Sequence, residues 1–163
     1  MKKKITLKNI LIVLVVLIVV AQLVPVTRDN PPVQADFNDN AAVKLVLKKS
    51  CYDCHSNESV WPWYSNIAPV SWLVASDVHE ARQKLNFSNW GLMTAARLKH
   101  APDNMWDEVN EGGMPLPQYL LIHTDAKLTD ADKAVIRAWA EGTAPAGTTG
   151  DTTKPVEPEE ESE

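Results

Sequence analysis

Cys51-Tyr52-Asp53-Cys54-His55 is the most informative stretch of this 163-residue chain. It contains both cysteines of the chain, so a framework of disulfides is excluded. Two cysteines three positions apart in a helical turn project to the same side, and the histidine follows directly. This spacing is the attachment signature of c-type haem, in which both thiols form thioethers and the histidine binds iron. The sequence therefore predicts one covalent haem c, with thioethers at Cys51 and Cys54 and with His55 as the proximal iron ligand.

Two other uses of such a cysteine pair fit the chain less well. A thioredoxin-like dithiol belongs to a βαβ pattern, and the sequence shows no alternating strand pattern of useful length. A structural zinc site takes four ligands, usually from two cysteine pairs, and the chain has one pair. Haem attachment also takes place outside the cytoplasm, where the N-terminal segment is expected to direct the chain.

The distal iron ligand is predicted to be Met114, 59 residues after His55. It follows Gly112-Gly113, which allow a close approach to the haem, and Pro115 and Pro117 stiffen the loop after it. A methionine–histidine pair is usual in electron-transfer cytochromes c and raises the reduction potential. Competing ligands are Met105, His100 and His123, and an open five-coordinate iron is a further alternative.

The N-terminal segment predicts export. Four lysines within residues 1–9 precede an apolar run over residues 10–26, and 17 residues lie at the short end of what spans a bilayer as a helix. The lysines are expected to stay in the cytoplasm, which places the rest of the chain outside. The interpretation is a single-pass membrane anchor. The rival is a signal peptide cleaved after Val33-Gln34-Ala35, which would leave a soluble periplasmic protein.

Composition divides the rest of the chain into three parts. Residues 27–35, with Pro31-Pro32, are expected to form a short stiff tether, and residues 36–141 the haem-binding domain. Residues 142–163 contain six acidic side chains and Lys154 and lack aromatics, so they are predicted to be a disordered acidic tail. This tail accounts for the whole net charge of −5. No basic patch remains, and nucleic-acid binding is not expected.

Inside the domain the apolar periodicity is helical, so the predicted fold class is all-α. One helix is expected to start at Asn38 or Asp39 and to end near Lys48-Lys49. Others are expected over residues 72–85, over residues 88–99 before Pro102, and from residue 103 to Gly112-Gly113. The last has the clearest signals: Thr129 as N-cap, Asp132 reaching back to it, and Gly142 beyond its end. Its predicted buried face comprises Ala131, Val135, Ala138 and Trp139.

Three stretches resemble the bacterial haem-binding domain family, whose members are exported and cytochrome-c-like. They are Cys51-Tyr-Asp-Cys-His-Ser-Asn-Glu, Trp61-Pro-Trp-Tyr-Ser-Asn-Ile-Ala-Pro-Val-Ser-Trp72 and Met114-Pro-Leu-Pro-Gln-Tyr-Leu-Leu-Ile-His123. More distantly, the order of motifs resembles class I cytochromes c, although residues 61–107 are longer and richer in tryptophan than in a minimal cytochrome. The resemblance implies a helical domain wrapped around one haem, and it matches Met114 to the distal ligand. It also implies that the Pro69 carbonyl accepts a hydrogen bond from the His55 ring.

The expected function is one-electron transfer with redox partner proteins rather than catalysis, because iron held by His55 and Met114 has no open position. A peroxidase-like haem enzyme needs an open sixth site and acid–base groups, which His100 or Glu111 would supply. A redox or gas sensor needs a displaceable Met114 and an output domain, and none follows the haem domain.

Overall fold

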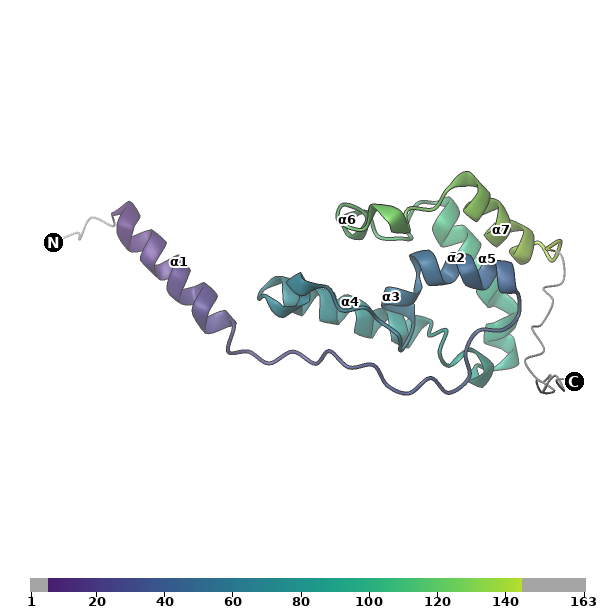
Figure 1. Ribbon diagram of the computed structural model, residues 1–163, viewed down its shortest axis with the longest axis horizontal. Coiled ribbons are helices and arrows are strands. Elements are labelled where there is room, and N and C mark those ends of the chain that lie inside the picture. The colour runs from purple at the N-terminus through teal and green to yellow at the C-terminus, as the bar shows by residue number, and fades with distance from the viewer. Residues whose placement is uncertain (1–5, 145–163) are drawn as a thin grey trace, which may run out of the picture.

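The computed structural model describes residues 6–144 (Figure 1). Within this range all regular elements are helical, which confirms the all-α prediction. The lysines at positions 2–4 and most of the predicted acidic tail lie outside the described residues. The α-helices are α1 (Leu7–Ala21), α2 (Ala41–Ser50), α3 (Tyr52–His55), α4 (Val70–Lys84), α5 (Ala95–Asn110), α6 (Pro117–Leu120) and α7 (Asp130–Ala140). Three 3-10 helices are η1 (Trp63–Asn66), η2 (Trp90–Leu92) and η3 (Thr124–Ala126).

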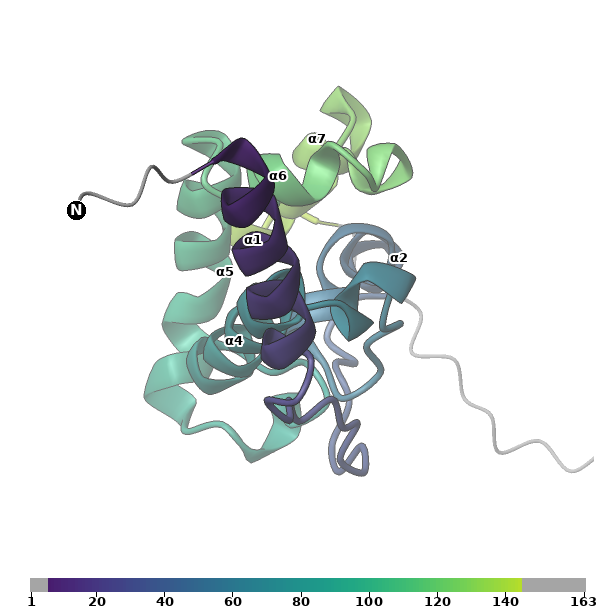
Figure 2. The ribbon, with the colours of Figure 1, turned by 90° about the vertical axis from the view of Figure 1, so that its left-hand side faces the viewer.

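The core lies between α2, α5 and α7. Helix α7 packs on α5 and α2, and the short α3 connects this layer to α4 (Figures 1 and 2). An aromatic cluster fills the centre, where the ring of Phe37 makes edge contacts with Trp90 and Trp139 at 4.9 and 5.5 Å between centroids. Such pairs add to the apolar area that they bury. A second buried cluster packs the other end of this layer and consists of Val46, Val109, Leu128 and Ile136.

Helix α2 follows its predicted pattern with a different cap. Asn40, not Asn38 or Asp39, accepts hydrogen bonds at Oδ1 from the N–H groups of Ala42 and Val43, at 2.9 and 3.1 Å. Asn40 itself is buried, because Phe37 just before it enters the core and fixes the path of the chain. Val43, Val46 and Leu47 are buried as expected, whereas Ala42 is exposed.

The two helices predicted on either side of Pro102 are one helix, and that prediction was wrong. Helix α5 begins after Thr94, whose hydroxyl accepts from the N–H of Arg97, and it continues through Pro102 to Asn110. A proline lacks the N–H that would bond the carbonyl four residues back, which weakens a helix interior. Packing outweighs this cost, because Ala101 and Val109 are buried in the two core clusters and the helix lies against α7.

Helix α7 has the predicted ends. The Thr129 hydroxyl accepts from the N–H of Asp132, and the Asp132 carboxylate accepts from the N–H of Thr129, which forms a capping box. Gly142 has a φ of 67° directly after the helix, a left-handed conformation that favours glycine. The buried face differs in part: Ile136 is fully buried, Val135 and Trp139 pack against the core, and Ala131 is exposed.

The N-terminal helix is shorter than the predicted membrane segment. Helix α1 ends at Ala21 instead of continuing to Val26, and the side chain of its C-cap residue Gln22 donates to the Ile18 carbonyl. Within residues 6–144 no helix reaches the length and apolar character that a membrane crossing requires. The predicted N-terminal membrane helix is therefore not found.

The segment predicted as a tether lies along the domain. Arg28 donates from Nη1 to the Ser65 carbonyl at 2.7 Å, and Asn30 donates from Nδ2 to the Ser59 carbonyl at 2.9 Å. The N–H groups of Gln34 and Ala35 both donate to the Ser88 carbonyl. Residues 28–35 thus run along the surface of the domain and are held there by hydrogen bonds, although most of their side chains are exposed.

Candidate haem-binding site

A cavity of about 690 Å³ lies between α3, α4, α5 and the loop before α6. This volume is within the range of roughly 300–1,000 Å³ found for cofactor sites. Apolar side chains form most of its wall, among them Leu85, Phe87, Val109 and Ile136. The cavity is also lined by Cys51, Cys54, His55 and Met114, so the structure brings these four predicted residues to one place.

The local backbone explains how the Cys-x-x-Cys-His motif faces one cavity. The N–H of His55 donates to the Cys51 carbonyl at 2.9 Å, which closes a single helical turn over the motif. The Ser56 hydroxyl donates to the Tyr52 carbonyl at 2.7 Å and ends this turn. Within such a turn, residues three and four positions apart lie on one side. The intervening Tyr52 points elsewhere and is buried in the aromatic core.

The two thiols are held in their protonated form. Burial raises the pKa of Cys51 to about 12 and that of Cys54 to about 11, and for Cys54 the nearby carboxylate of Asp53 adds to the effect. Thiols that act in disulfide exchange have a lowered pKa, because the thiolate is the nucleophile. The environment therefore disfavours a thioredoxin-like dithiol.

The carbonyl that orients His55 belongs to Leu85, so the role expected for Pro69 was wrong. His55 Nδ1 lies 3.0 Å from the Leu85 carbonyl oxygen. The Pro69 carbonyl instead accepts from the N–H of Trp72 at 3.1 Å. Since a carbonyl only accepts, Nδ1 carries the hydrogen and Nε2 of the neutral ring is left as a metal ligand. Burial also lowers the pKa of His55, which favours this neutral form.

The chain returns to the cavity at Met114 through a glycine-dependent turn. Gly112, with a φ of 77°, follows the end of α5, and the N–H groups of Gly113 and Met114 both donate to the Glu108 carbonyl. The positive φ of Gly112 is the feature that favours glycine, and the hydrogen bonds to Glu108 then direct the following loop back toward the cavity.

The other candidates for the distal iron ligand differ in whether they line the cavity. Met105 and His100 line the cavity together with Met114, and so does Met93, which no sequence motif singles out. His123 does not line it: its ring stacks on Tyr119, and its Nε2 lies 2.7 Å from the Tyr64 hydroxyl. Met93 lies 38 residues after His55, and only its place beside the cavity identifies it.

The cavity wall also contains positively charged groups. The cations Lys84 and Arg97 line the cavity and are suited to carboxylates of a porphyrin. The donor set, the apolar wall and these polar groups together fit haem.

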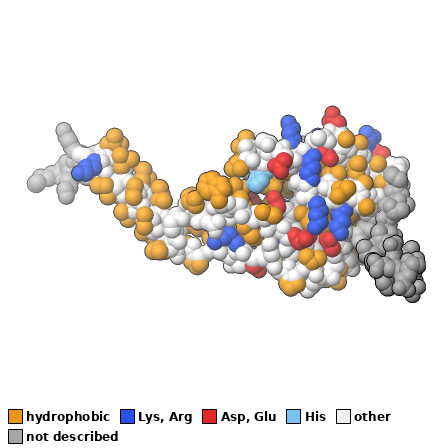
Figure 3. All heavy atoms as spheres, in the orientation of Figure 1, with side chains coloured by type: hydrophobic (Ala, Val, Ile, Leu, Met, Phe, Trp, Pro, Cys, Tyr) orange, Lys and Arg blue, Asp and Glu red, His pale blue; other side chains and the backbone are white. Residues whose placement is uncertain are grey.

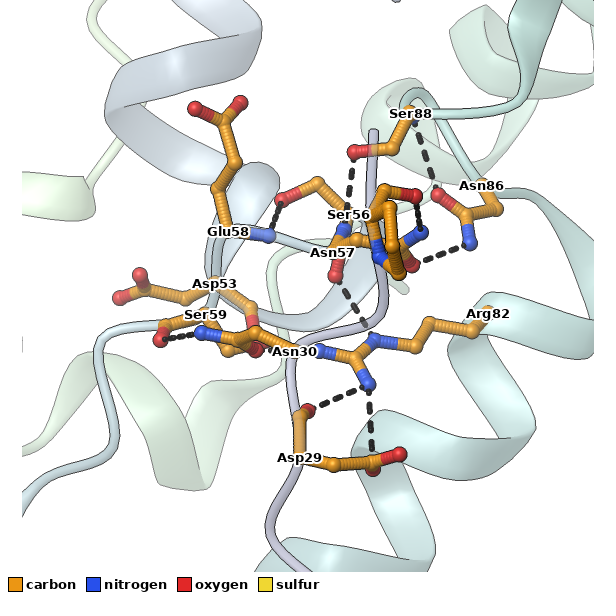
Figure 4. A network of polar contacts seen from close by, with 11 residues as sticks. Asp29, Asn30, Asp53, Ser56, Asn57, Glu58, Ser59, Arg82, Asn86 and Ser88 are labelled. Carbon is orange, nitrogen blue, oxygen red and sulfur yellow. Dashed lines mark hydrogen bonds and ion pairs between the residues drawn. The ribbon is translucent and has the colours of Figure 1, made fainter. Parts of the chain in front are cut away.

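Arg82 has a structural role next to the Cys-x-x-Cys-His turn. It does not line the cavity but lies behind the motif, where Nε donates to the Ser56 carbonyl at 2.7 Å (Figure 4). Its Nη1 donates to the Asp29 carbonyl, and its Nη2 donates to Asn30 Oδ1 and Ser59 Oγ. Arg82 therefore holds residues 29–30 against the back of the Cys-x-x-Cys-His turn.

An all-helical domain with a Cys-x-x-Cys-His turn in the wall of an apolar cavity has the features of a small haem-binding protein. A model of the haem-binding domain family matches residues 15–142, most of the chain, and the protein belongs to this family. The resemblance inferred from the sequence is thereby confirmed. No curated protein and no solved structure matches the chain.

Proposed function

We propose that this haem-binding protein carries one haem c and transfers single electrons at the outer face of the cytoplasmic membrane. The proposal rests mainly on one observation, that a single cavity is lined by Cys51, Cys54, His55 and Met114. When bound, haem iron supplies a one-electron redox couple whose potential depends on its axial ligands. Cys51 and Cys54 would hold the group covalently, His55 would bind the iron through Nε2, and Leu85 would fix the orientation of that ring.

Met114 favours an electron carrier over a catalyst. It follows the fixed turn at Gly112-Gly113, so its position is set by backbone hydrogen bonds to Glu108. A thioether in the sixth position would leave the iron without an open site for a substrate. Met93, Met105 and His100 line the same cavity, and a substitution series must therefore separate them.

The contacts of the N-terminal segment support its retention in the mature protein. Cleavage after Ala35 would remove Asp29 and Asn30 from Arg82, and Pro32 from the Asn57 side chain, which donates to the Pro32 carbonyl at 3.0 Å. Half-buried polar groups that lose their partners cost free energy. We therefore propose that residues 6–35 remain attached and that α1, whose residues are all unburied, keeps the domain at a membrane. At 1.5 Å per residue its 15 residues extend about 22 Å.

The test of the haem assignment is expression with export and haem-attachment machinery. The denatured polypeptide should retain the mass of one haem, and Cys51→Ala/Cys54→Ala should abolish that gain. A matched control is Cys54→Ala alone, which should leave one thioether at Cys51. Retention of covalent haem in the double variant would contradict the proposal. N-terminal sequencing of the same material tests the retained segment, and a mature N-terminus at Asp36 would contradict it.

A further inference from the structure

One end of the domain exposes a group of large apolar side chains. Trp63, Leu73 and Leu121 are 74%, 65% and 81% exposed, and Ile67, Val70 and Ile122 are exposed with them. We name these six residues the apolar end. They lie on η1, on the first turn of α4 and just after α6. An exposed apolar group of this kind marks a surface that contacts something other than water.

The apolar end is formed by two segments without charge. Residues 60–76 contain no acidic, basic or histidine residue, and residues 112–122 contain none either. Tyr64 and His123 join the two segments, with 2.7 Å between the Tyr64 hydroxyl and His123 Nε2. Helix α4 packs on η1 as well, so the exposed side chains belong to one continuous region. The two segments therefore contribute no charged side chain to the surface that they form.

Helix α1 leaves the domain directly beside the apolar end. The Gln22 side chain, one residue after α1, donates from Nε2 to the Ala68 carbonyl at 3.2 Å and accepts at Oε1 from the Ala68 N–H at 3.0 Å. Ala68 lies between Ile67 and Val70. Figure 3 shows hydrophobic side chains both along α1 and on the end of the domain that faces it. Figure 2 views the molecule from this side, with α1 in front of α4.

We propose that the apolar end rests on the lipid surface of the membrane. This inference rests on the proposed attachment of α1. Helix α1 has no buried residue and is joined to the apolar end through Gln22. Lipid that surrounds α1 would therefore also reach the apolar end. Tryptophan and tyrosine side chains favour the interfacial region of a bilayer, which suits Trp63 with its neighbours Trp61 and Tyr64.

Docking in this way would hold the domain in one orientation. Leu121 and Ile122 follow α6, and Tyr119 within α6 lines the haem cavity. The loop that carries Met114 therefore runs from the cavity to the lipid surface within nine residues. The cavity would lie close to the membrane, which suits exchange of electrons with a partner held there.

The experiment uses the full-length holoprotein in vesicles of phosphatidylcholine and phosphatidylglycerol, followed by hydrogen exchange and mass spectrometry. Wild type is compared with Leu73→Asp/Leu121→Asp and with the control Leu45→Asp, whose leucine on α2 is 74% exposed. All three sites are exposed, so each variant should fold. Exchange over residues 60–73 and 116–123 should be about tenfold slower in wild type and the control than in the double variant, or about 1.4 kcal/mol. Peptides from α5 and α7 should not differ.

Three other outcomes would each contradict the proposal, and each has a different explanation. Equal exchange in all three proteins, with the protein still on the vesicles, would mean that α1 attaches while the apolar end stays in water. Protection that rises with the ratio of protein to lipid would mean that a second copy covers the surface. If the protein does not sediment with vesicles, the proposed attachment of α1 to the membrane would be wrong as well. None of these results affects the covalent haem, which is tested separately through Cys51 and Cys54.

Discussion

The Tyr119 hydroxyl donates a hydrogen bond of 2.7 Å to Oδ2 of Asp53. Asp53 lies between the two cysteines of the attachment motif, and Tyr119 lies five residues after Met114. This contact joins segments 66 residues apart and ties the loop of the proposed distal ligand to the helical turn of the proposed proximal one. Burial and the Asp53 carboxylate both raise the pKa of Tyr119, so the phenol stays protonated and keeps donating.

Removing this tie should loosen the Met114 loop. Tyr119→Phe keeps the ring stacked on His123 and deletes only the donor. A hydrogen bond to a charged group contributes about 1.5–3 kcal/mol, and partial exposure here favours the lower value. We expect a drop of about 1–2 kcal/mol in the free energy of unfolding, together with a weaker sulfur–iron absorption band. The matched control is Tyr52→Phe, whose hydroxyl donates to Asp36 at 2.8 Å, away from the loop. A spectrum that changes equally in both variants would refute the specific tie.

Substitution of Met114 should separate an electron carrier from an enzyme. If the Met114 thioether occupies the sixth position as proposed, the reduced haem of the native protein should bind carbon monoxide poorly. Met114→Ala should abolish the far-red band of sulfur–iron ligation and allow carbon monoxide to bind. Met114→His should lower the reduction potential, since a thioether favours reduced iron more than an imidazole does.

The controls for Met114 are the other sulfur atoms at the cavity. Met93→Leu and Met105→Leu keep volume and apolar character, and both should leave the band in place. Loss of the band in either variant would reassign the distal ligand. A native protein that binds carbon monoxide readily and turns over peroxide would favour the enzyme alternative.

Arg82 should contribute much more to stability than an exposed arginine. Its guanidinium donates to four groups, two of them in residues 29–30, so Arg82→Gln should leave several carbonyls without a partner. We expect a loss of about 2–4 kcal/mol in the free energy of unfolding and faster proteolysis within residues 28–35. Arg137→Gln is the control, because Arg137 forms an exposed pair with Glu141 that contributes at most about 0.5 kcal/mol. Similar losses in both variants would contradict the docking of this segment.

The contribution of the α7 capping box to the free energy of unfolding should depend on pH. Asp132 accepts from Lys49 Nζ at 2.6 Å and from Thr129, and these contacts lower its pKa from 3.8 to about 2. A carboxylate whose pKa is lower in the folded state stabilises the fold above its unfolded pKa. That contribution is lost as the pH falls from about 4 toward 2. Circular dichroism during acid titration should show a smaller stability loss for Asp132→Asn than for wild type. An identical pH dependence would mean that the pair contributes nothing.

Features that depend on neighbours along the chain could be predicted from the sequence. The capping box of α7 involves residues three positions apart, and the Cys-x-x-Cys-His turn spans five, so both follow from local geometry. The helical periodicity likewise predicted the fold class.

The carbonyl that orients His55 depends on tertiary packing and could not be predicted locally. Leu85 lies 30 residues away and reaches the ring through the packing of α4 on α3. Tertiary packing also decided that α5 continues through Pro102, where burial of Ala101 and Val109 outweighs a missing hydrogen bond. The docking of residues 28–35 and the tie between Tyr119 and Asp53 are contacts of the same kind: their free energy exists only once distant segments have met.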